Sequence, residues 1–288
     1  MHITLCLLVR NEQEIVRENI LYHLNLGVKR FLVMDHLSTD NTRTILEDLI
    51  SKGLDLRIYP QESPTYYQNA WMTFLSQEAH RLGTDWVMPC DADEFWLPPN
   101  GQTIPDYLRG VEAEGFGAVY GMHNNNKAIK GIEPFYKNHY FAPCPWQRKV
   151  LHKSCADIAL AMGNHYLESP PVPVKDDPSL RVMHYKDRNV QVMYNKLVIG
   201  GEALESTKEV ADNMGTHWRE GLAAYRKGEF EQYVNFFFNT VEDLEKQQDC
   251  YKDDTIEQLI IKSMQTPVPP PVENKTLGKR DILLRLTK

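Results

Sequence analysis

Apolar runs and amphipathic segments alternate along the first hundred residues, and this alternation restricts the fold more than any other feature of the sequence. Apolar residues recur at helical spacing between the runs, and Gly27, Gly53 and Gly83 stand where such helices are expected to end. The pattern predicts strands at 3–9, 30–34, 54–59 and 85–90, separated by helices at 12–26, 40–52 and 67–82. Repeated β-α-β units form a parallel sheet with right-handed crossovers, and such sheets bind ligands beyond the carboxyl ends of their strands.

The second half of the sequence is less regular. A proline-rich linker is expected at 266–271 and a short docking helix at 281–286. The remaining pattern predicts strands at 116–122, 147–152 and 181–185, helices at 188–199 and 253–264, and an aromatic helical region from 216 onward. We therefore expect an α/β domain at 1–200, a helical extension at 201–265, and a linker with a tail at 266–288.

Composition excludes several classes of protein. The chain has 288 residues, of which 42% are apolar and 25% charged, so it is not intrinsically disordered. Its net charge of −7 does not suit a general nucleic-acid binder. No stretch approaches the ~20 apolar residues of a membrane span. Five cysteines without a close pair favour reduced thiols over a disulfide framework, so we expect a cytoplasmic protein, with at most peripheral contact to a membrane.

Three carboxylates follow the fourth predicted strand directly. If that strand continued, Asp91 and Asp93 would share one face about 7 Å apart. Two unit charges at that distance repel by about 2 kcal/mol at an effective dielectric of 20, and a divalent cation turns the repulsion into attraction. Carboxylate oxygens suit Mg²⁺ or Mn²⁺, which can also bind substrate phosphates. The third carboxylate of this segment is Glu94. The alternative interpretation of residues 91–94 is an acidic turn exposed to solvent.

Asp35 and His36 follow the second predicted strand. The segment Ser38 to Asn41 caps the next helix, which explains those residues without a ligand. Capping leaves Asp35 and His36 unexplained. A carboxylate at a strand end can accept hydrogen bonds from a nucleobase or a ribose, so Asp35 is a candidate nucleotide contact.

The segments 7–12, 33–42 and 91–95 together resemble glycosyltransferase family 2 in their order and spacing. They are most similar to the branch with Asn-Glu after the first strand and Asp-x-Asp-Glu-Phe after the fourth. The resemblance implies a GT-A fold, a Rossmann-like and mostly parallel sheet with helices on both faces. It further implies a nucleotide-sugar half at 1–100 and an acceptor half at 101–200. The implied reaction is an inverting, metal-dependent transfer from a nucleotide-diphosphate sugar to a glycan, lipid-linked or protein acceptor.

The resemblance also implies roles for individual residues. Asp91, Asp93 and His184 would hold Mn²⁺ or Mg²⁺, with Asp91 also close to the ribose. Many relatives have Asp-Asp where this chain has Asp35-His36, which puts the contact to the base at position 36 in question. The expected nucleotide-sugar contacts are Arg10, Asn11, Glu12, Asp35, His36, Asp91, Lys186 and Arg188, with Lys196 as a further cation for the diphosphate.

The general base is the least determined part of the site. Glu94 lies next to the metal motif and is the first candidate, and His165, Glu168 and Asp187 are alternatives. An aspartate phosphatase would carry its Asp-x-Asp after the first strand, and a glycoside hydrolase would not explain the nucleotide motifs. A non-catalytic nucleotide-sugar-binding module is the remaining alternative.

Overall fold

The computed structural model describes residues 1–168, 170–207 and 215–268. Their strands form one mixed sheet in the order β3-β2-β1-β4-β7-β6-β8-β5, with β9 paired to β7. The strands are β1 (Ile3–Val9), β2 (Arg30–His36), β3 (Leu56–Gln61), β4 (Trp86–Asp91), β5 (Glu94–Leu97), β6 (Ala118–Asn126), β7 (Tyr140–Lys153), β8 (Val174–His184) and β9 (Tyr251–Lys252). Strands β1 to β4 pair in parallel, as their pattern predicts, whereas β7 pairs antiparallel to both β4 and β6.

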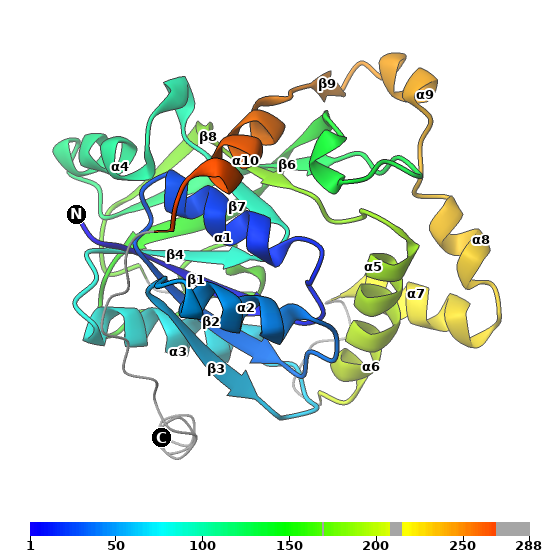
Figure 1. The fold of residues 1–288 in the computed structure, drawn as a ribbon, viewed down its shortest axis with the longest axis horizontal. Coiled ribbons are helices and arrows are strands. Elements are labelled where there is room, and N and C mark those ends of the chain that lie inside the picture. Colours follow the sequence, from blue (N-terminus) through cyan, green and yellow to red (C-terminus); the bar gives the residue numbers. More distant parts are fainter. Residues whose placement is uncertain (169, 208–214, 269–288) are drawn as a thin grey trace.

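Helices cover both faces of the sheet, which confirms the expected α/β fold (Figure 1). The helices are α1 (Val16–Asn25), α2 (Thr42–Ser51), α3 (Gln68–Arg81), α4 (Ile104–Ala113), α5 (Val190–Tyr194), a π-helix (Asn195–Ile199), α6 (Gly200–Glu205), α7 (Thr216–Arg226), α8 (Phe230–Asn235), α9 (Val241–Glu245) and α10 (Thr255–Gln265). The helix expected at 188–199 is thus a longer helical region that includes one π turn and continues to Glu205. The predicted docking helix at 281–286 lies outside the described residues.

Two apolar cores sandwich the parallel strands. Leu5 and Leu7 of β1 pack in the core that includes α1, α2, α4 and α10, while Cys6 and Leu8 pack toward α3. Successive side chains of a strand point to opposite faces, so a strand buried on both faces reads as an unbroken apolar run. The described helices include none with the length and apolar character needed to cross a membrane.

Strand β4 ends at Asp91, which corrects the expectation that Asp91 and Asp93 lie on one face of a continuing strand. The chain turns at Ala92 and Asp93, and Glu94 then begins β5. Strand β5 pairs with β8 at the far edge of the sheet, so that Glu94 lies opposite His184. The turn therefore sends the carboxylates of Asp91 and Asp93 to different partners.

Candidate functional site

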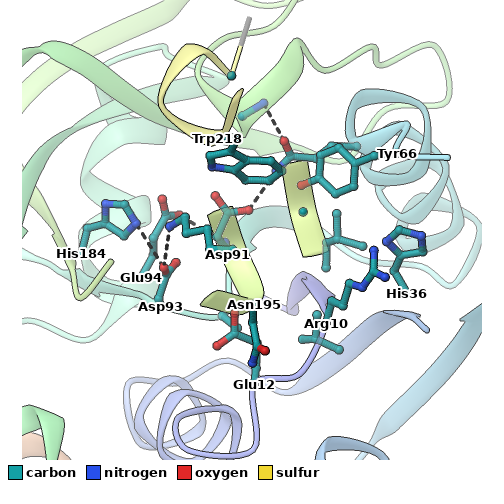
Figure 2. Close-up of a pocket in the computed structure, with 18 of the residues that line it drawn as sticks. Arg10, Glu12, His36, Tyr66, Asp91, Asp93, Glu94, His184, Asn195 and Trp218 are labelled. Atoms are coloured by element: carbon teal, nitrogen blue, oxygen red, sulfur yellow. Dashed lines mark hydrogen bonds and ion pairs between the residues drawn. The ribbon is translucent and has the colours of Figure 1, made fainter. Parts of the chain in front are cut away.

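A cavity of about 420 Å³ opens beyond the carboxyl ends of β1, β2 and β4. Its volume falls in the range of small-molecule sites. Figure 2 shows Asp93, Glu94 and His184 together on one side, and Arg10 and His36 on the other. The lining includes Arg10, Asn11, Glu12, His36, Tyr66, Gln68, Asp91, Asp93, Glu94, His123, Gln147, Lys149, His165, His184, Asn195, Lys196, His217 and Trp218.

Lys149 is a buried cation that joins two of the three acidic residues. Its Nζ lies 2.8 Å from Asp91 Oδ2 and 2.7 Å from Glu94 Oε1, and it donates to the carbonyl of Gly163 at 2.6 Å. The other oxygen of Asp91 accepts a hydrogen bond from Gln68 Nε2 at 3.0 Å. Burial raises the pKa of Asp91 to about 6, with Lys149 opposing the rise. Asp91 is thus held in place by protein donors.

His123 and His184 form the centre of a second cluster at this end of the cavity. Their rings stack with centroids 4.6 Å apart. Nδ1–H of His184 donates to Asn125 Oδ1 at 2.9 Å, and Nδ1–H of His123 donates to Gln147 Oε1 at 3.1 Å. An amide oxygen only accepts hydrogen bonds, so each contact places a ring proton on Nδ1, and a neutral ring then keeps its lone pair on Nε2.

Both Nε2 atoms face carboxylate oxygens. His184 Nε2 lies 3.3 Å from Asp93 Oδ2, and His123 Nε2 lies 2.9 Å from Glu94 Oε1. Burial lowers the pKa of His184 to about 4, so this ring is neutral at pH 7. Lone pairs directed at carboxylate oxygens repel unless a cation lies among them. One ligand atom each from Glu94, His123 and His184 falls within 4.8 Å of the others, so these residues fit a divalent cation.

Three further charged residues adjoin this cluster. Lys196 Nζ lies 3.4 Å from Asp93 Oδ2, and Arg188 Nη1 lies 4.0 Å from the same oxygen. Burial opposes ionisation of Asp93, but the positive charges of Lys196 and Arg188 outweigh it and hold the pKa of Asp93 well below its usual range. Arg188 Nη2 also contacts Glu12 Oε2 at 2.7 Å. Asp93 is therefore ionised at neutral pH and surrounded by cations.

The opposite end of the cavity is aromatic and carries unused donors. Tyr66 and Trp218 have ring centroids 5.6 Å apart, and His36 lies 6.0 Å from Tyr66. His36 Nε2–H donates to the carbonyl of Ser63 at 2.8 Å. Within the described ranges, Arg10 Nε and Nη1 and His36 Nδ1 are buried without a hydrogen-bond partner. Of these atoms the two Arg10 nitrogens are donors, whereas His36 Nδ1 is an acceptor because its ring carries the proton on Nε2. Buried polar atoms without partners are costly in a folded protein, so this end suits a planar ligand with polar atoms on its edge, including acceptors for Arg10.

The structure brings most of the predicted site residues to this one cavity. Asp35, Lys186, Asp187 and Arg188 do not belong to the lining, and Glu168 is exposed. Asp35 Oδ2 instead forms an ion pair with Arg43 Nε at 3.1 Å, and Asp187 Oδ2 lies 3.5 Å from Lys186 Nζ. The predicted residues that do line the cavity are Arg10, Asn11, Glu12, His36, Asp91, Asp93, Glu94, His165, His184 and Lys196.

Sequence reasoning missed His123, Lys149 and Trp218 as site residues. Lys149 carried a usable signal in the sequence, because it precedes the apolar residues Val150 and Leu151 in a predicted strand. In the structure its side chain is 2% exposed. His123 had no motif around it. Trp218 belongs to the aromatic region from 216 onward, whose pattern favours core packing and leaves stacking on a sugar as the lesser alternative.

Comparison with known proteins identifies a family. The model of glycosyltransferase family 92 matches residues 2–208. A family 92 protein of Oryza sativa subsp. japonica is 33% identical over 117 residues, which cover 38% of this chain and 18% of that protein. One of Ricinus communis is 26% identical over 113 residues, covering 38% of this chain and 20% of that protein. The matched region thus spans about a fifth of the length of these relatives.

Solved structures with weaker likeness include TarS 1–349 of S. aureus in complex with UDP, at 16% identity and a TM-score of 0.40, covering 93% of this chain and 82% of TarS. Glucosyl-3-phosphoglycerate synthase of Mycobacterium tuberculosis, with Mn²⁺, UDP and phosphoglyceric acid, is 21% identical with a TM-score of 0.32, covering 42% and 43% of the two chains. The matching family is family 92 rather than the family 2 that the motifs resemble. Both are families of glycosyltransferases, so the expectation that the chain belongs to a glycosyltransferase family is confirmed.

Proposed function

Because the chain belongs to glycosyltransferase family 92, we propose that it transfers a sugar from a nucleotide-diphosphate sugar to a hydroxyl group of a glycan, lipid-linked or protein acceptor. The transfer inverts the anomeric centre and depends on a divalent cation. One observation carries the proposal: a single cavity joins an aromatic end with free donors to an end with a carboxylate–imidazole cluster. A nucleoside fits the first end, and a diphosphate bound through a cation fits the second.

We place the cation among Asp93, Glu94, His123 and His184. The two imidazoles contact Asp93 and Glu94, whereas the oxygens of Asp91 accept from Lys149, Gln68 and Asn164, so Asp91 is left out of this set. Two imidazole ligands favour Mn²⁺ over Mg²⁺, which prefers oxygen. Asn125 and Gln147 orient the two rings from behind, as second-layer groups do in metal sites. When bound, the cation stabilises the negative charge that grows on the leaving diphosphate.

The protein's own groups align the reaction. Arg10 binds the nucleoside end of the donor, and Lys196 adds positive charge next to the diphosphate. The acceptor oxygen forms a bond to C1 of the sugar while the bond from C1 to the diphosphate oxygen breaks. Attack from the face opposite the leaving group inverts the configuration. The proton of the acceptor hydroxyl passes to a protein base.

His165 is the base that the contacts favour. Glu94 is 0% exposed; its Oε1 lies 2.7 Å from Lys149 Nζ, and its Oε2 accepts from the backbone N–H of Asp91. The charge of Lys149 outweighs burial and holds the pKa of Glu94 far below its usual range, which makes it a weak base. His165 donates Nδ1–H to the carbonyl of Arg148 at 2.8 Å. Its Nε2 lone pair has no partner among the described residues and belongs to a ring that lines the cavity.

Titration calorimetry with UDP, GDP and CDP, each with Mn²⁺, Mg²⁺ or chelator, tests the donor site. We expect one nucleoside diphosphate to bind in Mn²⁺ and to bind more weakly in chelator. A turnover assay with the matching nucleotide sugars then tests transfer. If no nucleoside diphosphate binds in Mn²⁺, the proposed function is wrong.

A further inference from the structure

We propose that Trp218, on helix α7, stacks on the nucleobase of the donor, so that the C-terminal helical extension completes a site built mainly by the α/β domain. The proposal rests on the proposed function and deepens it by assigning a specificity-determining residue. Trp218 lies beyond residues 2–208, to which the family model corresponds. It nevertheless lines the same cavity as Arg10 and Asp93.

Close packing fixes the position of the indole. A Cβ atom added to Gly200 would lie 3.0 Å from Cζ3 and 3.2 Å from Cε3 of Trp218, and one added to Gly201 would lie 3.1 Å from its carbonyl oxygen. The absence of side chains at Gly200 and Gly201 therefore lets α7 approach α6. The backbone N–H of Tyr66 donates to Thr207 Oγ1 at 2.8 Å, which ties the second ring to the end of the same helical region. Two aromatic rings are thus held in place before any ligand binds.

The groups around these rings indicate a base rather than a phosphate or a sugar. Figure 2 shows Trp218 beside Tyr66, with Arg10 and His36 nearby. The Arg10 donors can bind carbonyl oxygens on the edge of a nucleobase while an aromatic ring covers its face. A sugar has no flat face that exposes carbonyl acceptors. The diphosphate has its own partner in Lys196, which lies by Asp93 at the other cluster.

The test compares Trp218→Ala with Trp146→Ala. Trp146 is 80% exposed and does not belong to the cavity lining, so it is a matched control for removing an indole. Titration calorimetry in Mn²⁺ measures the affinity for UDP, for GDP and for inorganic pyrophosphate, which has no base. We expect Trp218→Ala to weaken the nucleotide that the wild type prefers by about 5- to 150-fold, the usual effect of losing one stacked base. Pyrophosphate affinity should not change.

A fluorescence titration gives an independent readout. Stacking on a base is expected to change the emission of Trp218, so the signal on nucleotide addition should remain in Trp146→Ala and largely disappear in Trp218→Ala. If Trp218→Ala does not fold, Trp218→Phe and Gly200→Ala replace it. The first keeps a smaller ring, and the added Cβ of the second pushes the indole from its place. Both should weaken the nucleotide and leave pyrophosphate unaffected.

The outcomes separate this proposal from the proposed function. A wild-type protein that binds no nucleoside diphosphate refutes the proposed function itself. A wild type that binds nucleotide, with a folded Trp218 variant that binds it equally well, overturns only the role of Trp218. Equal weakening of nucleotide and pyrophosphate also overturns it, because the indole would then support the site without contacting the base.

Discussion

Replacing Lys149 by methionine removes the only ammonium that contacts both Asp91 and Glu94 among the described residues. Methionine keeps a similar length and an apolar stem, so the change chiefly removes charge. At the observed distances of 2.8 Å and 2.7 Å, each contact has a gross Coulomb energy of about 6 kcal/mol at an effective dielectric of 20. Desolvation of the buried charges offsets much of that energy.

The net loss is still large because the variant leaves two carboxylates buried without their cation. Breaking a buried pair by removing one partner costs about 3–5 kcal/mol. A domain is stable by only about 5–15 kcal/mol, so Lys149→Met should lose about a fifth or more of the free energy of unfolding. In a Glu94→Gln background one of the two charges is already gone. The cost of Lys149→Met should then fall by at least about 1 kcal/mol.

Urea unfolding followed by circular dichroism, in chelator, measures these losses without interference from bound metal. Lys153→Met is the matched control on the same strand. Lys153 Nζ lies 3.1 Å from Glu112 Oε1, but its side chain is 44% exposed, so its loss should cost at most about 1 kcal/mol. A Lys149→Met protein within about 1 kcal/mol of the Lys153 variant would refute the reasoning that Lys149 compensates both carboxylates.

Three further predictions follow from the site and the core. Burial lowers the pKa of His152 to about 4. Between pH 6.5 and pH 4 the unfolded chain therefore binds a proton at His152 that the folded protein does not. The free energy of unfolding falls as the pH drops through this range. His152→Gln should remove about 3 kcal/mol of that fall, measured by urea unfolding at both pH values. Arg10→Ala should weaken nucleoside diphosphate binding by about 10- to 100-fold. Asp35→Ala should weaken it much less, because Asp35 does not line the cavity. Equal losses of affinity in calorimetry would contradict the assignment of Arg10 as the nucleotide contact. Asp93→Asn should abolish the dependence of nucleotide affinity on Mn²⁺, whereas a variant that chelator still weakens as strongly would exclude Asp93 as a ligand.

The first four strands could be predicted from the sequence because parallel strands buried on both faces need unbroken apolar runs. Strand β1 has its predicted bounds, and β2 and β4 begin within one residue of theirs. Strand β7 was predicted only at 147–152, although it begins at Tyr140. Its first part includes two prolines and a shift of register against β6, so neither apolar runs nor regular alternation marks it.

The sequence by itself placed Arg10 and Asp93 in the candidate site, because strand ends in a parallel sheet meet at one edge and the motifs mark those ends; His184 was implied only by the family resemblance. Only the tertiary structure decided that Asp91 and Asp93 contact different partners. A turn at residues 92–93 directs Asp91 to Lys149, 58 positions away, while pairing of β5 with β8 brings His184 to Asp93. Trp218 reaches the cavity because Gly200 and Gly201 allow close helix packing. These contacts depend on how elements that are distant in the sequence pack together, and the local hydrophobic pattern of a segment does not predict that packing.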